Sequence, residues 1–534
     1  MHLAKNVGNL LSSVVVASTL FSATQALAVG PDVLRIKGDI ARAQFGNGTV
    51  NGTGLVVGVI DSGVNFSHPF LSTPGRVVAQ ANFVTTEPAN TGADVVGHGT
   101  WVSSVLGSND ATQFGAASGA RFINARVLDS FNNFNTDSWI VNGAGFALDP
   151  GQGRSGSDIL NFSLGYGGGT RDGNTYLSRM ADYISFARNV PVVVSAGNSG
   201  ASNDPVPRGP GDAFNVFSAA ATDSTYDRIV NFSNFGPTSD GRNMPNLAAP
   251  GTSVAAANHN YTPINGQPLT VSVNGTSFAA PNITGILTTQ MGFGRTNGLS
   301  TDPLVLRATS INSSEKIRDR FNSTWAPASS SNVGGVFNVT SPLNSSAGAG
   351  QIDGQKLVSQ YTAGEFGPTS AQGVLPQIAW DENAIASGDF IDYSLGQLVP
   401  GTTLTATLAW ERHVGWTDGA FGTANGLVDS TDNFSVLNRL SNLDLQIFRN
   451  STLIAQSISA VDTLEHLWLT NIIGGDYTLR ILRSTLASLN GLNPVQGNEP
   501  FALAWASTQV PEPMALATVF GMTMVLLRRR GKSC

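Results

Sequence analysis

Apolar and polar residues follow two different patterns along the 534-residue chain, and the pattern changes between residues 357 and 375. From residue 55 to about residue 310, short runs of consecutive apolar residues alternate with segments whose apolar residues are spaced as on one face of a helix. Runs of this kind suit strands that are buried on both faces of a parallel sheet. The predicted strands are 55–60, 122–128, 159–164, 192–196 and 216–221, and the predicted helices include 137–148 and 176–188. This alternation predicts a doubly wound, mostly parallel α/β domain over residues 29–357.

Beyond residue 375, apolar and polar residues alternate with a period of two. Leu404, Leu443, Tyr477 and Phe501 each begin such a segment, and Gly and Asn residues separate the segments. The pattern is typical of strands with one buried face, and it predicts an all-β sandwich domain at residues 375–509. Residues 323–350 are rich in Ser, Asn, Gly and Pro, so we expect a long loop there.

Both ends of the sequence carry features of processing segments. Residues 1–28 contain Lys5, an apolar run over 10–21 and the small-residue sequence Ala26-Leu27-Ala28. This order predicts a secretory signal peptide that is cleaved after Ala28, and the alternative is a buried first helix. The chain is therefore expected to be exported.

Residues 510–534 contain Pro511-Glu512-Pro513, an apolar run over 514–527 and a cluster of Arg and Lys. The run is shorter than the ~17–25 residues of a permanent membrane helix, and the cations are expected to stay on the cytoplasmic side. These three features resemble the PEP-CTERM sorting tail of Gram-negative bacteria. The resemblance implies cleavage by an exosortase-type enzyme and a final location outside the cell or on its surface.

Charge and cysteine content exclude several functions. The net charge is −7, and without the two terminal segments 24 Lys and Arg face 35 Asp and Glu, a net charge of −11. Such an acidic protein is not expected to bind nucleic acid or an anionic membrane as its main task. The only cysteine is Cys534, so a disulfide scaffold, a thiolate metal cluster and a cysteine nucleophile are excluded or disfavoured.

Three polar motifs lie where predicted strands end or helices begin. Asp61 follows the apolar run 55–60, His98 is the one histidine of six that lies between two glycines, and Ser277 opens a predicted helix. Each residue alone has an ordinary explanation, namely a turn, a surface histidine or a helix cap. Together they supply a nucleophile, a base that accepts its proton and a carboxylate that orients the base. Their chain order, Asp, His, Ser, is that of subtilisin, whereas chymotrypsin and the α/β-hydrolases have other orders.

Over roughly residues 50–357 these motifs resemble the subtilases, the family of subtilisin-like serine endopeptidases. The resemblance implies that Asn198, in Ser195-Ala196-Gly197-Asn198, completes an oxyanion hole. It also implies that Ser163, Leu164, Gly165 and Gly197 bind the backbone of an extended polypeptide substrate. The alternating segments beyond residue 375 resemble the jelly-roll domain that follows some subtilase domains. No cofactor is expected for catalysis, and the protein is expected to act as a monomer.

The sequence also departs from the family pattern. Only 32 residues separate Ala28 from Asp61, so no inhibitory propeptide domain of the usual size is expected. Trp101 and Phe278 stand where the family often has histidine and methionine. The loop after His98 is short for a calcium loop, so Asn109 and Asp110 are not assigned as ligands and a structural calcium ion is an open expectation.

Four alternatives remain to be compared with a secreted endopeptidase. An inactive subtilase scaffold would keep the fold without the chemistry, and a surface-attached binding protein would act through its β domain. A sedolisin would use a glutamate as base, which His98 between two glycines argues against. A lipase would carry Gly-x-Ser-x-Gly, and Ala279 breaks that pattern.

Overall fold

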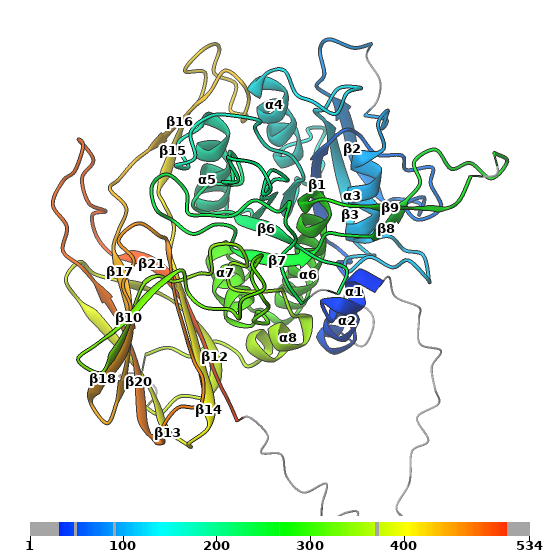
Figure 1. The fold of residues 1–534 in the computed structure, drawn as a ribbon. Helices are drawn as coiled ribbons and strands as arrows, with labels where there is room; N and C mark the ends of the chain where they lie inside the picture. Colours follow the sequence, from blue (N-terminus) through cyan, green and yellow to red (C-terminus); the bar gives the residue numbers. More distant parts are fainter. Residues whose placement is uncertain are drawn as a thin grey trace, which may run out of the picture.

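A computed structural model describes residues 31–46, 51–88, 92–225, 227–265, 267–368 and 373–509 (Figure 1). The predicted signal peptide (1–28) and sorting tail (510–534) lie outside these residues. Within the described ranges, no helix combines the length and the apolar character that a membrane span requires.

A seven-stranded parallel sheet forms the centre of the first part of the chain. Its order is β2-β3-β1-β4-β5-β6-β7. The strands are β1 (Val56–Asp61), β2 (Val77–Asn82), β3 (Arg121–Arg126), β4 (Ile159–Phe162), β5 (Val192–Ser195), β6 (Phe217–Thr222) and β7 (Leu247–Pro250). All neighbouring strands pair in parallel, which confirms the predicted α/β class. Two strands were not predicted from the sequence, namely β2, a half-exposed edge strand, and the short β7.

Helices cover both faces of this sheet. On one side lie α3 (His98–Gly107) and α6 (Thr276–Asn297), and on the other lie α4 (Asp137–Leu148) and α5 (Tyr176–Arg188). Successive residues of β1 point to opposite faces, so Val57 and Val59 pack with α6 whereas Val56 and Ile60 pack with α4. The sheet is therefore buried on both sides, as its apolar runs predicted.

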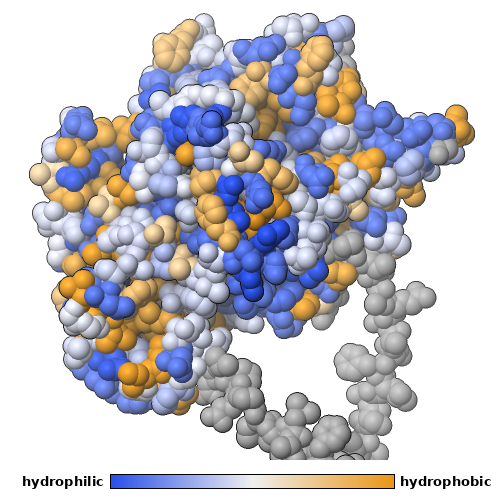
Figure 2. Space-filling model, in the orientation of Figure 1, coloured by the Kyte–Doolittle hydropathy of each residue, from blue (hydrophilic) through white to orange (hydrophobic). Residues whose placement is uncertain are grey.

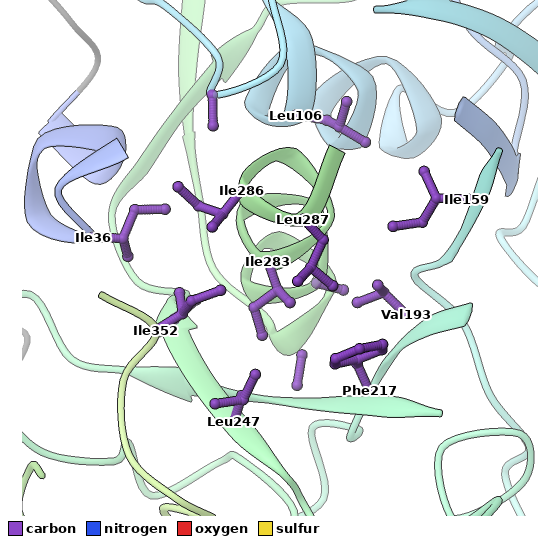
Figure 3. Packing of buried hydrophobic residues seen from close by; sticks show 14 of the residues in the cluster. Ile36, Leu106, Ile159, Val193, Phe217, Leu247, Ile283, Ile286, Leu287 and Ile352 are labelled. Atoms are coloured by element: carbon purple, nitrogen blue, oxygen red, sulfur yellow. The ribbon is translucent and has the colours of Figure 1, made fainter. Parts of the chain in front are cut away.

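Helix α6 runs through the first of these two cores. Its residues are buried from Thr276 to Gly292, and Figure 3 shows Ile283, Ile286 and Leu287 surrounded by apolar side chains of the sheet and of α3. The helix is therefore buried on all sides, and its buried polar side chains bond within the protein, as Thr284 does with Asn161 and Gln290 with Thr309. Because this burial fixes α6, the position of its first residues is fixed as well. Those first residues include Ser277.

Short elements complete the first part of the chain. α2 (Gly38–Gly46) packs on α6 and α8 (Gly354–Thr362), α1 (Pro31–Arg35) contacts α2, and α7 (Pro303–Asn312) follows α6. The strands β8 (Val254–Ala257) and β9 (Thr270–Val273) form an antiparallel hairpin that leads into α6.

The later strands form two further sheets that share one apolar cluster. The six-stranded sheet has the order β10-β11-β18-β17-β20-β13, and the four-stranded sheet has the order β12-β21-β14-β19. Their bounds are β10 (Ser329–Val333), β11 (Val336–Ser341), β12 (Ile378–Ile385), β13 (Phe390–Leu398), β14 (Thr402–Ala409), β17 (Leu443–Arg449), β18 (Thr452–Ser457), β19 (Leu464–Leu469), β20 (Gly475–Arg483) and β21 (Glu499–Gln509). A separate hairpin pairs β15 (Val414–Thr417) with β16 (Asn433–Val436). We call residues 373–509, with β10 and β11, the two-sheet region.

The prediction of a long loop at residues 323–350 is wrong. β10 and β11 form an antiparallel hairpin whose turn residues Gly334 and Gly335 both have positive φ, and β11 pairs in parallel with β18. Every residue of β10 is exposed, so its Ser and Asn residues carry no apolar alternation. The hairpin owes its position to pairing with a strand more than a hundred residues later, which composition does not reveal.

The two-sheet region packs firmly on the first part of the chain. α7 and α8 contact β12, β14 and β21, and Trp380 and Ala409 belong to the same apolar cluster as α6. Beyond β14, the buried Arg412 donates from Nε to Asp182 of α5 at 2.8 Å and also pairs with it through Nη2. Asn215 closes this contact, because its amide donates to the Arg412 carbonyl (2.8 Å) and its oxygen accepts from the Arg412 N–H (2.8 Å).

Candidate active site

A cleft of about 590 Å³ lies at the carboxyl end of the parallel sheet. Open parallel sheets bind their ligands at this edge, because strands end and helices begin there. The cleft brings together most of the side chains singled out in the sequence. Its lining includes His98, Asn198, Ser277, Ser163, Leu164 and Gly165. Asp61 lies behind His98 at the end of β1, fully buried.

Asp61 and His98 form a direct hydrogen bond. The His98 Nδ1 atom is 2.7 Å from Asp61 Oδ1, and the same oxygen accepts from the Ser62 N–H at 2.7 Å. A carboxylate on Nδ1 favours the tautomer whose Nε2 is free to accept a proton. Burial by itself lowers the pKa of His98. The carboxylates of Asp61 and Asp94 raise this pKa by more than burial lowers it, so the pKa of His98 lies above its ordinary value.

Asp94 connects the two segments that carry this pair. Its Oδ1 accepts from the Ser62 hydroxyl (3.0 Å) and from the N–H groups of Val96 (3.0 Å) and Gly97 (2.7 Å). Its Oδ2 accepts from the Thr100 N–H (2.9 Å) and hydroxyl (2.5 Å). Asp94 therefore holds the end of β1 and the first turn of α3 together, a role that was not predicted from the sequence.

The glycines on either side of His98 are required by close contacts. A Cβ atom on Gly99 would lie 2.0 Å from the Gly63 carbonyl oxygen, and Gly97 has φ +108° with His259 directly beside it. Side chains at these positions would push α3 away from the end of β1. The two glycines thus allow His98 to approach Asp61.

Ser277 is the second residue of α6, so its N–H belongs to the first turn, where the backbone N–H groups have no partner within the helix. Its hydroxyl donates to the Ser163 carbonyl at 3.3 Å, and its own carbonyl accepts from the Ser163 hydroxyl at 2.8 Å. The Ser277 hydroxyl must turn away from Ser163 to reach His98 Nε2. Both groups line the same cleft, and hydrogen bonds of this kind commonly tighten only when substrate is bound.

Asn198 is held by the residue that precedes Ser277. Its Oδ1 accepts from both the N–H and the hydroxyl of Thr276, each at 2.9 Å, and the Thr276 hydroxyl accepts from the Gly197 N–H at 3.1 Å. With the amide oxygen fixed in this way, the NH₂ group of Asn198 is available to the cleft. Thr276 is a second positioning residue that the sequence analysis did not identify.

The residues after β4 form one wall of the cleft. Ser163, Leu164 and Gly165 line it, and the Ser163 hydroxyl accepts from the Asn161 amide at 3.0 Å. Aromatic rings surround the remaining space: Trp101 and Phe278 lie 6.3 and 5.8 Å from the His98 ring, and Phe134 contacts Tyr166.

The loop that follows α3 has no assigned metal. Asp110 Oδ1 accepts from Thr112 N (2.8 Å), Thr112 Oγ1 (2.6 Å) and Gln113 N (3.0 Å), so this oxygen is engaged within its own turn. Among the residues that the structure describes, no three His, Cys, Asp or Glu side chains are grouped as a metal site.

Comparisons with known proteins agree with this geometry. Residues 52–350 match the model of the subtilase family, Peptidase S8. Subtilisin DY of Bacillus licheniformis is 33% identical over 255 residues, which cover 47% of this chain and 80% of that protein. Thermitase of Thermoactinomyces vulgaris is 30% identical over 240 residues (44% and 74%), and a thermophilic serine proteinase of Bacillus sp. strain AK1 is 31% identical over 252 residues (47% and 55%).

The chain therefore belongs to the subtilase family and is a subtilisin-like serine peptidase. The match ends at residue 350, so most of the two-sheet region lies outside it.

Proposed function

We propose that the protein is a secreted serine endopeptidase that cleaves extended polypeptides through an acyl-enzyme. The observation that carries the proposal is the Asp61–His98 hydrogen bond at the back of the cleft that also contains Ser277 and Asn198. This arrangement supplies a base of fixed tautomer, a hydroxyl nucleophile and an amide donor in one place.

The reaction follows from these positions. A substrate strand adds along Ser163–Gly165, and its scissile carbonyl comes to lie beside the start of α6. His98 Nε2 takes the proton of the Ser277 hydroxyl as Oγ bonds to the carbonyl carbon, and Asp61 stabilises the imidazolium. The oxyanion accepts from the Asn198 amide and from the Ser277 N–H, where the helix dipole also favours negative charge.

Collapse of this intermediate breaks the peptide bond. His98 returns its proton to the leaving amine, and the acyl group stays on Ser277. Water then attacks the acyl-enzyme with His98 again acting as base, which releases the new carboxyl end and restores the Ser277 hydroxyl.

The test is the variant Ser277→Ala, with Ser359→Ala on the exposed face of α8 as the matched control. We expect Ser277→Ala to lose casein hydrolysis and fluorophosphonate labelling while its circular dichroism spectrum is unchanged, and Ser359→Ala to keep both activities. Hydrolysis by folded Ser277→Ala at the wild-type rate would exclude this nucleophile. Failure of the wild-type protein to react with the probe would favour an inactive scaffold or a binding protein.

We further propose that residues 1–28 direct export and that residues 510–534 are a PEP-CTERM-like tail removed by an exosortase-type enzyme. The order of charged, apolar and small residues in 1–28 supports export, and the order of Pro-Glu-Pro, apolar run and basic cluster in 510–534 supports the sorting tail. For residues 375–509 we propose a jelly-roll-like domain, supported by two sheets with one shared apolar cluster. Mature protein from the native host is expected to lack residues 514–534. An intact mass that includes Cys534 would instead indicate a retained anchor.

A further inference from the structure

One end of the two-sheet region exposes aliphatic side chains. Val333, Val374, Val399 and Ile473 have exposed fractions of 65%, 70%, 46% and 67%. Val333 is the last residue of β10, Val374 lies in the segment between α8 and β12, and Val399 and Ile473 lie in the connections β13 to β14 and β19 to β20. Single exposed aliphatic residues are ordinary on protein surfaces, but a group of them on one face indicates a binding surface.

Strand pairing places these connections at the same end. Leu398 pairs with Gly475, which joins the β13–β14 turn to the start of β20. Arg449 pairs with both Thr452 and Tyr477, and β11 runs parallel to β18, so the β10–β11 turn lies beside the β17–β18 turn. Val374 packs over Gly396 near the end of β13. We call residues 333–336, 373–377, 398–402, 449–452 and 470–476 the distal end.

The distal end carries very little charge. Its only charged residues are Arg449 and Asp476. The connections at the other end of the sheets contain Arg412 and Glu411 and pack against the peptidase part of the chain. Figure 2 shows hydrophobic side chains at the lower end of the molecule, where the turn between β13 and β14 lies in Figure 1.

The described chain also leaves the protein at the distal end. Gln509, the last residue of β21, pairs with Thr402 at the start of β14. The apolar run of the tail begins at Met514, five residues further on. An extended chain spans at most ~3.6 Å per residue, so Met514 lies within about 18 Å of Gln509.

We propose that the distal end is a lipid-facing surface that rests on the membrane while the tail is attached. The proposal rests on the tail assigned under Proposed function: if residues 514–527 are held in a bilayer, the short connection brings this end of the protein to the bilayer surface. The body without its terminal segments carries −11, so anionic lipid repels most of its surface. The nearly uncharged distal end can approach the lipid without that repulsion, and its four aliphatic side chains gain from burial in the interface.

The experiment uses the full chain on vesicles of phosphatidylethanolamine and phosphatidylglycerol. Cys534 is replaced by serine, and an environment-sensitive fluorophore is attached to Val399→Cys, to Ile473→Cys or, as the control, to Phe421→Cys. Phe421 is 71% exposed and lies in the loop between β15 and β16, at the top of Figure 1. We expect spin-labelled lipid to quench the probes at 399 and 473 and to leave the probe at 421 unchanged.

Each other outcome is informative. The proposal of a lipid-facing surface is overturned if the chain binds vesicles but the probes at 399 and 473 are not quenched, or if the probe at 421 is quenched equally. The proposal that the tail attaches the chain to the membrane then still stands. If the chain does not bind vesicles, both the lipid-facing surface and the attachment by the tail are overturned. A concentration-dependent shift of the probes without vesicles indicates contact between two copies and also overturns the proposal.

A second pair of variants tests the side chains themselves. Val399→Asp with Ile473→Asp is expected to remove the quenching of a probe at Val374→Cys, although the tail still holds the chain on the vesicle. Hydrolysis of a soluble peptide by the same samples reports on folding and is expected to be unchanged. This readout keeps failure of the surface distinct from failure of the proposed peptidase function.

Discussion

Replacement of Asp94 by Asn tests how the base of the active site is held. The variant keeps the size of the side chain, but it removes the negative charge and turns one acceptor oxygen into an NH₂ donor. Asp94 Oδ1 accepts three hydrogen bonds and Oδ2 accepts two, and the donors belong to Ser62 just after β1, to Val96 and Gly97 just before α3, and to Thr100 in its first turn.

The loss of stability expected for Asp94→Asn depends on the orientation of the new amide group, and the orientation that leaves fewer hydrogen bonds unmade is preferred. With the amide oxygen in the place of Oδ1, the NH₂ group faces the Thr100 N–H, which is fully buried. The Thr100 hydroxyl can turn to accept, but the N–H cannot, so one buried donor loses its partner at a cost of ~1–3 kcal/mol. The opposite orientation would leave the N–H groups of Val96 and Gly97 without their acceptor, so it is not preferred.

The pH profile of activity provides a separate readout. The Asp94 carboxylate helps to raise the pKa of His98, and His98 must be neutral to take the proton of Ser277. Without that charge the pKa of His98 falls, so the acid limb of kcat/KM moves to lower pH. A purely structural role for Asp94 would reduce stability and leave the limb where it is.

Asp110→Asn is the matched control, because Asp110 also accepts several hydrogen bonds within one turn but is not among the groups that raise the pKa of His98. Guanidinium denaturation measures stability. The pH dependence of kcat/KM on a soluble chromogenic peptide between pH 5 and 9 gives the position of the acid limb. An unmoved or higher acid limb in Asp94→Asn would refute the electrostatic reasoning. A loss of stability below the stated range would refute the hydrogen-bond reasoning.

Two further predictions concern the contact between the peptidase part and the two-sheet region. Arg412→Ala leaves the buried Asp182 carboxylate with the Asn215 N–H but without its cationic partner, and it is expected to cost ~3–5 kcal/mol in denaturant unfolding. A loss under ~1 kcal/mol would show that the ion pair is dispensable. His466 is buried, and the Lys316 Nζ atom lies 3.0 Å from the His466 Nε2 atom. Burial and this cation lower the pKa of His466 well below 6.5, so at low pH the unfolded chain binds a proton at this histidine that the folded chain does not bind. Stability is therefore expected to fall as pH drops below about 6.5, and His466→Gln should flatten that slope; an identical slope in both proteins would contradict the assignment.

The sequence predicted those parts of the fold in which local pattern and burial agree. The bounds of α4 and α5 match the predicted helices, because Thr136 and Thr175 cap their first turns and apolar residues keep helical spacing within them. The five predicted strands are almost completely buried, whereas β7 was missed although it is buried, because it has only four residues. The half-exposed β2 and the exposed β10 were missed, since an edge strand needs little apolar alternation.

The residues of the candidate site also fall into those that could be predicted from the sequence and those that could not. Asp61, His98 and Ser277 could be proposed because motif and chain order indicate their chemistry. Asp94 and Thr276 act only through hydrogen bonds that form when distant segments meet. The position of Asp94 in the sequence gives a weak signal, because an acidic residue just before a helix often binds the free N–H groups of the first turn of that helix. That indication suggests a cap and gives no reason to connect Asp94 with Ser62.

Pro281 shows how one local irregularity serves the site. It lies within α6, where proline has no N–H to donate to the carbonyl four residues earlier. That carbonyl belongs to Ser277, and it accepts instead from the Ser163 hydroxyl at 2.8 Å. The proline thus frees an acceptor that ties the proposed nucleophile to the wall where substrate is expected to bind. Pro281→Ala is expected to supply an N–H that competes for the Ser277 carbonyl, so we infer that Pro281 helps to fix Ser277 relative to β4.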